Sequence, residues 1–81
     1  MGKHSLKSDD DTELLQALGS NIRMMRHYLG YSQEAFARHI GLDRGYMGCV
    51  ERGERNLATL NLIKIARGLN VSVGKLFKGI K

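Results

Sequence analysis

The chain of 81 residues contains no proline and no tryptophan, and its aromatic residues are two phenylalanines and three tyrosines. Because Cys49 is the only cysteine, no disulfide can form within the chain, which fits a reducing compartment. No apolar run approaches the roughly 20 residues of a membrane-spanning helix, and the N-terminus lacks the apolar core of a signal peptide. These absences predict a cytoplasmic protein rather than a secreted or membrane protein.

The charged residues are divided unevenly along the chain. Residues 1–13 carry two basic and four acidic side chains, whereas residues 14–81 carry eleven basic and four acidic ones. We predict a flexible polar tail over residues 1–12 and one small domain over residues 13–81. A basic domain attracts polyphosphate at long range, although a solvated lysine-rich face also explains a modest positive charge. So small a domain buries little surface, and help from a second copy would be expected.

The most specific spacing lies in residues 32–53. The apolar side chains recur there at offsets of three and four residues, with one break in phase, and are Phe36, Ile40, Leu42, Met47 and Val50. Gly41 can end a first helix with positive φ, which glycine adopts without steric penalty. Ser32 can cap that helix, and Asp43 can cap a second helix that Gly53 ends. This spacing is typical of a helix-turn-helix, although an ordinary helical hairpin in a small bundle shares much of it.

The remaining apolar residues predict three more helices. A first helix, ended by Gly30, carries a stripe formed by Leu14, Leu18, Ile22, Met25 and Leu29. A fourth helix, capped by Thr59, is apolar over a wide arc. A fifth helix, capped by Ser72, carries on one face Val73, Leu76, Phe77 and Ile80. Since no β pattern, internal repeat or proline-rich linker competes, we predict an all-α fold of five helices.

The segment DRGYMGCVERGERN carries a resemblance to a known family. It is similar to the pattern DRTYIS-x-IERG-x-RN found in many Cro/C1-type (XRE-type) helix-turn-helix regulators, including the controller proteins of restriction–modification systems. The likeness covers about residues 18–77. It implies a compact five-helix, lambda-repressor-like domain with the helix-turn-helix at helices 2 and 3. In that family the third helix enters the major groove of double-stranded DNA.

The resemblance implies a set of DNA-contacting residues in the two motif helices and the turn after them: Gln33, Arg38, Arg44, Gly45, Tyr46, Gly48, Cys49, Arg52, Arg55 and Asn56. Gln33 opens the first motif helix and is expected to contact a phosphate. Arg44 can donate two hydrogen bonds to guanine O6 and N7, worth ~1–3 kcal/mol of discrimination, or it can clamp a phosphate. Arg52, Arg55 and Asn56 are expected to reach the flanking phosphates.

Four of these positions keep a second interpretation. Gly45 and Gly48 stand where many relatives have Thr and Ser, so two potential base contacts are missing. The glycines either let the helix lie closer to the groove floor, or they leave specificity low or dependent on DNA shape. Tyr46 can contact the DNA backbone or pack beside Met47. Arg38 can contact a phosphate or remain solvated.

The resemblance also implies supporting and interface roles. Arg26 and Glu51 are expected to form a structural ion pair, because they match the positions that are paired in the family. Leu76, Phe77 and Ile80 of the last helix are expected to join two copies, or alternatively to belong to the core of one chain. One helix reads only a few base pairs, so a homodimer suits a site made of two half-sites.

No other chemistry is indicated by the sequence. Cys49 and the three histidines lack the spacing of a metal site, and we expect no metal, cofactor or small-molecule effector. We expect no enzymatic activity either, because no nucleophile–base pair or phosphate loop is visible. The sequence therefore predicts a homodimeric transcriptional regulator that binds a dyad-symmetric operator, located in the cytoplasm on the nucleoid. An antitoxin-like module that binds a protein partner is the alternative.

Overall fold

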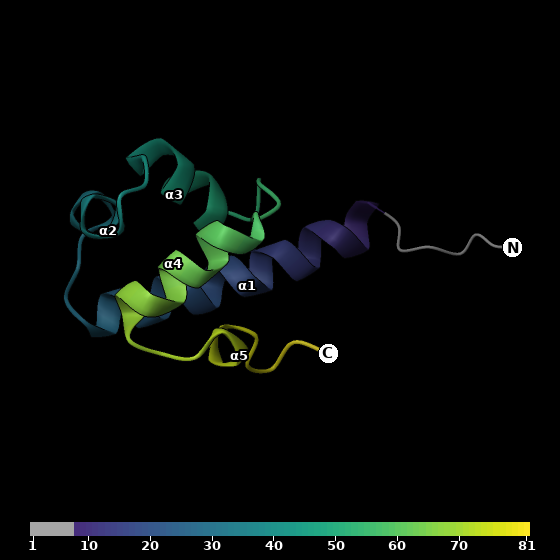
Figure 1. The fold of residues 1–81 in the computed structure, drawn as a ribbon. Helices are drawn as coiled ribbons and strands as arrows, with labels where there is room; N and C mark the ends of the chain where they lie inside the picture. Colours follow the sequence, from purple (N-terminus) through teal and green to yellow (C-terminus); the bar gives the residue numbers. More distant parts are fainter. Residues whose placement is uncertain (1–7) are drawn as a thin grey trace, which may run out of the picture.

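Five helices follow one another along residues 8–81, the part of the chain that the computed structural model describes (Figure 1). They are α1 (Ser8–Tyr28), α2 (Gln33–Ile40), α3 (Arg44–Glu51), α4 (Thr59–Leu69) and α5 (Val73–Leu76). The long helix α1 packs against α3, α4 and α5, and α2 packs against α3 and α4. Residues 8–81 contain no strand, so the predicted all-α fold of five helices is confirmed. No helix within this range is long and apolar enough to cross a bilayer.

The core lies where α1, α2, α3 and α4 converge. Phe36 of α2 and Met47 of α3 are fully buried there, in one cluster with Ile22 of α1 and Ile65 of α4. Burying a side chain of this size contributes roughly 1.5–3 kcal/mol relative to leaving it in water. The other buried apolar members of the cluster are Leu18, Ala37, Val50, Ala66, Leu69 and Leu76. Because both motif helices contribute to this cluster, their crossing is set by the packing of the whole domain.

Side-chain caps and one glycine shape the turn between α2 and α3. The Ser32 hydroxyl accepts a hydrogen bond from the backbone N–H three residues later, at 3.0 Å. Asp43 Oδ2 accepts the equivalent bond at the start of α3, at 3.1 Å. Gly41, which ends α2, has a φ of 75°. The predicted caps and the predicted left-handed glycine are therefore confirmed.

The N-terminal boundary differs from the prediction. The sequence places a flexible polar tail over residues 1–12, whereas α1 already begins at Ser8. Residues 1–7 lie outside the described residues. The first turns of α1 contain Asp10, Asp11 and Glu13, all exposed, and negative charge is favourable near a helix N-terminus. The first turns of α1 are exposed and carry no apolar stripe, so the apolar pattern did not predict that the helix begins there.

The start of α4 also differs from the prediction. Thr59 is the first residue of the helix and not its cap; the N-cap is Ala58, which makes no side-chain capping bond. The carbonyl oxygen of Ala58 accepts a hydrogen bond from the N–H of Leu62 at 3.0 Å. The backbone therefore enters the helix one residue earlier than the side-chain pattern suggests.

The last helix is shorter than the sequence predicts. α5 ends at Leu76, so Phe77 and Ile80 lie in turns after the helix and not on it. Asn21 of α1 donates hydrogen bonds from Nδ2 to the carbonyl oxygens of Leu76 at 2.8 Å and Lys78 at 2.9 Å. These carbonyls are thereby directed toward α1, and the C-terminal turn is tied to the long helix.

The crossing of α1 and α3 depends on a glycine. A Cβ atom built on Gly19 would overlap the carbonyl oxygen of Val50 and would lie 2.6 Å from that of Glu51. Backbone atoms at the end of α3 cannot move aside without shifting the helix. Gly19 therefore lets α3 lie directly against α1.

We expect Gly19→Ala to destabilise the domain by about 1–3 kcal/mol, because the added methyl group separates α1 from α3. For a domain of this size, this corresponds to a melting temperature lower by about 5–20 °C, measured by circular dichroism. Gly74→Ala is the matched control, since a Cβ atom there has nothing within 4 Å. Equal melting temperatures for the two variants would contradict the role of Gly19.

Candidate nucleic-acid interface

The outward surface of α3 carries few side chains of its own. Met47 and Val50 point into the core, whereas Arg44 and Gly45 are exposed and Cys49 is half-buried. Asp43 caps the helix in front of Arg44, so the first turn of α3 has a defined start. We define the outward face of α3 as Arg44, Gly45, Gly48 and Cys49, together with the side chains that lie over them. Gly48 itself is buried, beneath the side chains of Arg52 and Gln33.

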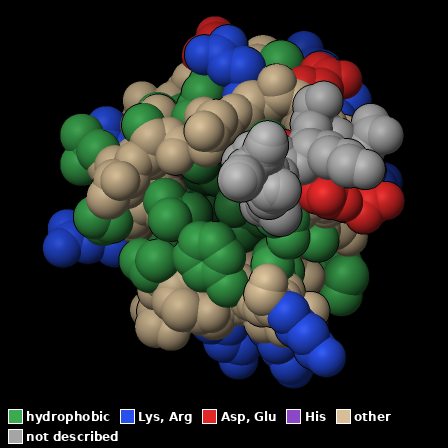
Figure 2. All heavy atoms as spheres, turned by 90° about the vertical axis from the view of Figure 1, so that its right-hand side faces the viewer, with side chains coloured by type: hydrophobic (Ala, Val, Ile, Leu, Met, Phe, Trp, Pro, Cys, Tyr) green, Lys and Arg blue, Asp and Glu red, His purple; other side chains and the backbone are tan. Residues whose placement is uncertain are grey.

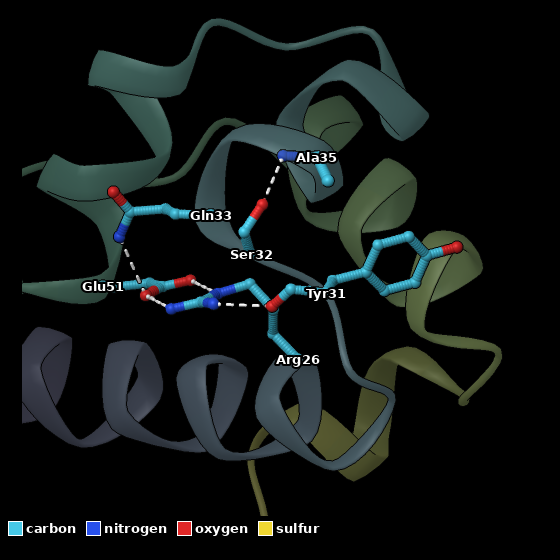
Figure 3. A network of polar contacts seen from close by, with 6 residues as sticks. All are labelled: Arg26, Tyr31, Ser32, Gln33, Ala35 and Glu51. Atoms are coloured by element: carbon cyan, nitrogen blue, oxygen red, sulfur yellow. Dashed lines mark hydrogen bonds and ion pairs between the residues drawn. The ribbon is translucent and has the colours of Figure 1, made fainter.

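A buried polar network joins three helices behind this face (Figure 3). Arg26 of α1 donates from Nε to Glu51 Oε2 at 2.7 Å and from Nη2 to Glu51 Oε1 at 2.8 Å. Arg26 also donates from Nη1 to the carbonyl oxygen of Tyr31, in the loop before α2, at 2.8 Å. Gln33 of α2 donates from Nε2 to Glu51 Oε1 at 3.0 Å. The predicted Arg26–Glu51 ion pair is confirmed, and Gln33 is its third member.

The network is fully satisfied as well as buried. The side chains of Arg26 and Glu51 are only 6% and 3% exposed. Two parallel hydrogen bonds between a guanidinium and a carboxylate form the strongest geometry for such a pair. No buried side-chain nitrogen or oxygen lacks a partner within the described residues. A buried ion pair offsets its desolvation cost only when its geometry is good and every donor and acceptor is hydrogen-bonded. The Arg26–Glu51 pair therefore requires α1, α2 and the end of α3 to be aligned.

Tyr46 is held against the domain by two neighbours. Its hydroxyl accepts a hydrogen bond from Asn61 Nδ2 of α4 at 3.1 Å, and its ring is half-buried against the core. The guanidinium of Arg55 lies over the ring, with its central carbon 5.3 Å from the ring centroid. The structure therefore places Tyr46 in packing between α3 and α4, while Arg55 is positioned by a cation–π contact.

Arg52, the C-cap residue of α3, folds back over its own helix. Arg52 Nε donates to Glu54 Oε2 at 3.0 Å, and Nη2 lies 3.7 Å from Cys49 Sγ. The hydrogen bond and charge of Glu54 raise the pKa of the Arg52 guanidinium above its ordinary value. The same hydrogen bond lowers the pKa of the Glu54 carboxyl. Both side chains are more than half exposed, so this pair orients Arg52 and adds little stability.

A polar cavity of about 310 Å³ lies beside Gln33 and Arg52, and its other lining residues are Arg23, Arg26, His27 and Glu51. The sequence pattern did not indicate a role for Arg23 or His27 beside the motif. They lie four residues apart on α1, and Arg26 lies between them, so the three basic side chains share one helix face. Helical spacing alone could have grouped them. It could not have shown that this face borders the motif helices.

The other predicted site residues lie outside the polar cavity. Arg38 and Asn56 are exposed. Leu76 is fully buried within one chain and belongs to the core, whereas Phe77 is 38% exposed. Ile80 is half-buried. Of the three predicted interface residues, only Phe77 and Ile80 therefore reach the surface. Within residues 8–81, no group of three or more His, Cys, Asp or Glu side chains is placed to bind a metal ion.

Comparison with known proteins gives consistent matches. The family model described as helix-turn-helix (HTH_3) matches residues 22–76. The control protein C.SmaI of Serratia marcescens is 42% identical over 71 residues, covering 85% of this chain and 84% of that protein. A hypothetical transcription factor of Neisseria meningitidis is 42% identical over 67 residues, or 83% of this chain, and the chain spans 63% of its length.

One solved structure adds a nucleic-acid complex. The restriction–modification controller protein C.Esp1396I, crystallised as a tetramer with its natural 35 base-pair operator, has a TM-score of 0.72 and 37% identity. The similarity covers 80% of this chain and 86% of that chain.

We expect Glu51→Ala to cost about 3–5 kcal/mol of unfolding free energy, because Arg26 is then left buried without its carboxylate. The double variant Arg26→Met with Glu51→Leu is expected to recover most of this loss. Urea unfolding followed by circular dichroism measures both. Glu54→Ala, which breaks the exposed Arg52–Glu54 pair, is the matched control and should leave the midpoint unchanged. A loss for Glu51→Ala no larger than for the control would show that the buried pair does not align the helices.

Proposed function

Because the chain belongs to the helix-turn-helix (HTH_3, XRE-type) family of DNA-binding transcriptional regulators, we propose that it binds a dyad-symmetric operator as a homodimer through α3. The observation that carries this proposal is the capped α2–α3 pair: the outward face of α3 lies beside the polar cavity, which four basic side chains line. Members of this family are regulators and not enzymes. The matched relatives give no support to the antitoxin alternative. We place the protein in the cytoplasm on the nucleoid, where a bacterial regulator meets its operator.

Arg44 is the base-reading side chain at the start of α3. It is exposed, and the Asp43 cap defines the helix turn from which it projects. A guanidinium entering the major groove can donate two hydrogen bonds to guanine, with ~1–3 kcal/mol of discrimination. Gly45 beside it is also exposed and adds no bulk, so the backbone of α3 can approach the groove floor closely.

Phosphate contacts are proposed on both sides of α3. On one side lie Gln33 and the two basic residues of α1 that line the same cavity, Arg23 and His27. On the other side lies the turn after α3, with Arg55 held over Tyr46 and with Asn56 exposed. Basic and amide side chains in these places can fix the orientation of the domain on the duplex without reading its sequence.

The surface proposed to join two copies is an apolar groove of about 330 Å³ between α1, the α3–α4 loop and the C-terminal turn. Its apolar lining includes Leu14, Leu57, Phe77 and Ile80. Figure 2 shows hydrophobic side chains gathered around a hollow at the end of the molecule where α1 begins and the C-terminus lies, with charged side chains at the rim. Such a patch with a polar rim is typical of an interaction surface.

A second copy is the occupant that we propose for this groove. Asn56 lines the groove and also belongs to the proposed DNA-contacting turn, so a copy bound here lies beside that turn. The operator complex of C.Esp1396I, which contains a tetramer on 35 base pairs, supports assembly of several copies on one site. Two recognition helices about one helical turn apart would then reach successive major grooves.

Selection of bound sequences from a random duplex pool tests the regulator proposal. We expect the wild-type protein to enrich a site with dyad symmetry. Arg44→Ala should lose the preference for one base pair in each half-site, with ~1–3 kcal/mol less discrimination there. Arg67→Ala is the control, because Arg67 is exposed on α4 and lines a different cavity. If the wild-type protein enriches no symmetric site, the proposed function is wrong.

A charge placed in the groove tests the dimer surface. We expect Phe77→Glu to shift the protein from dimer to monomer in sedimentation velocity runs, because the carboxylate would be desolvated between two copies. Tyr28→Glu is the control: Tyr28 is 90% exposed and lines another cavity, at the far end of α1. A wild-type protein that sediments as a monomer on operator DNA, or a dimeric Phe77→Glu variant, would refute this interface.

A further inference from the structure

We propose that Arg52 is a second specificity-determining side chain of the recognition helix, and that Gly48 provides the space in which its guanidinium lies. This inference rests on the proposed DNA-binding function and adds a base contact to it. The sequence alone assigned Arg52 to a flanking phosphate and left the middle of α3 without a reader. The geometry of the outward face of α3 supports a different role for Arg52.

The guanidinium of Arg52 covers the middle of α3. Arg52 Nη1 lies 3.1 Å from the position of a Cβ atom on Gly48, and Nη2 lies 3.7 Å from Cys49 Sγ. Long side chains in helices extend toward the N-terminus and cover the preceding turn. The charge of Arg52 is therefore placed one turn inside the helix and not at its end. The side chain is 59% exposed, so a ligand can reach it.

Gly48 is the position that makes this placement possible. The atoms nearest to a Cβ built there are Arg52 Nη1 at 3.1 Å and Gln33 Oε1 at 3.3 Å. Any side chain at position 48 would push against both groups. Glycine is unfavourable inside a helix, so its presence here is a local cost. The space it leaves is filled by Arg52 from the following turn, which supplies donor groups where residue 48 has none.

Glu54 orients Arg52 without blocking its outer nitrogens. The carboxylate accepts from Nε at 3.0 Å, while Nη1 and Nη2 lie near Gly48 and Cys49. Glu54 itself is 55% exposed in its side chain, so phosphate or base atoms can compete for the guanidinium at small cost. Nη1 and Nη2 of Arg52 each carry two N–H groups, and the hydrogen bond from Nη2 to Cys49 Sγ uses only one of them. The guanidinium can therefore still donate to the O6 and N7 acceptors of guanine in the major groove.

A phosphate contact is the competing role for Arg52. Arg52 also lines the polar cavity that contains Arg23, His27 and Gln33, where a phosphate would be attracted. A phosphate contact fixes the domain on DNA of any sequence, whereas a base contact affects a single position in the site. The position of the guanidinium over Gly48 and Cys49, on the outward face of α3, favours the base contact.

The test compares wild-type protein with Arg52→Ala, Arg52→Lys and Gly48→Ala in the same random-pool selection, followed by binding to single-base variants of the enriched site. For Arg52→Ala we expect the preference at one base pair per half-site to fall by about 5- to 100-fold, with other positions unchanged. Arg52→Lys should lose most of the same preference, because lysine keeps the charge but not the paired donors. Arg55→Ala is the control and should weaken binding to all variants equally.

Gly48→Ala separates the placement of Arg52 from the stability of the domain. The added methyl group displaces the exposed guanidinium and the end of Gln33, so the gain in helix propensity is offset by strain on the hydrogen bond from Gln33 to Glu51. The melting temperature should therefore stay close to that of the wild type. The preference at the Arg52 position should nevertheless decrease. In an Arg52→Ala background, Gly48→Ala should have no further effect at that base pair.

The outcomes separate this inference from the proposed function. A wild-type protein that enriches no symmetric site would refute the function itself. A wild-type protein that enriches a site, with Arg52→Ala weakening all variants equally, would assign Arg52 to a phosphate and overturn the inference. If Gly48→Ala still changes the preference at the same base pair in the Arg52→Ala background, the proposed role of Gly48 is wrong.

Discussion

The ion pair between Arg26 and Glu51 is the interaction on which the geometry of the motif depends. Its two parallel bonds connect the middle of the domain, since Arg26 comes from the long helix α1 and Glu51 is the last residue of α3. Arg26 also binds the loop before α2, and Glu51 binds the first residue of α2. Because both groups are buried, each requires the other, and a shift of α1 or α3 would leave a charge unpaired. A shift of α2 would remove the hydrogen bond that Gln33 donates to Glu51.

Close packing allows a weak helix to be held in place. α3 has eight residues, two of which are glycines, and so short a helix is marginal by itself. Met47 and Val50 anchor it in the core, and Gly19 lets it lie against α1 without an intervening side chain. Tertiary packing therefore supplies the stability that the sequence of α3 lacks. As a result, the outward side of the helix can have small residues, which leaves room for DNA and for Arg52.

The described surface divides into faces of different chemistry. Around α3, basic and amide-bearing side chains from α1, α2 and the α3–α4 loop gather beside the carboxylates of Glu51 and Glu54. At the end of the molecule shown in Figure 2, the surface is apolar and is lined by α1, the α3–α4 loop and the C-terminal turn. The loop borders both faces, because Arg55 lies over Tyr46 of α3 and the next two residues, Asn56 and Leu57, line the apolar groove. In the proposed assembly, this loop connects contact with DNA to contact with the second copy.

The helices of the motif could be predicted from the amino-acid sequence, because their ends depend on local chemistry: Ser32 and Asp43 cap them, and Gly41 has positive φ. Family resemblance also identified Arg26 and Glu51. The side chains that surround α3 could not be predicted in this way, because their positions depend on distances between separate helices that the folded domain sets. The folded domain brought Arg23 and His27 to the motif, held Tyr46 against α4, buried Leu76 and folded Arg52 over Gly48. A pattern of residue types indicates the face of a helix on which a side chain lies, but not which residues of other helices that side chain contacts.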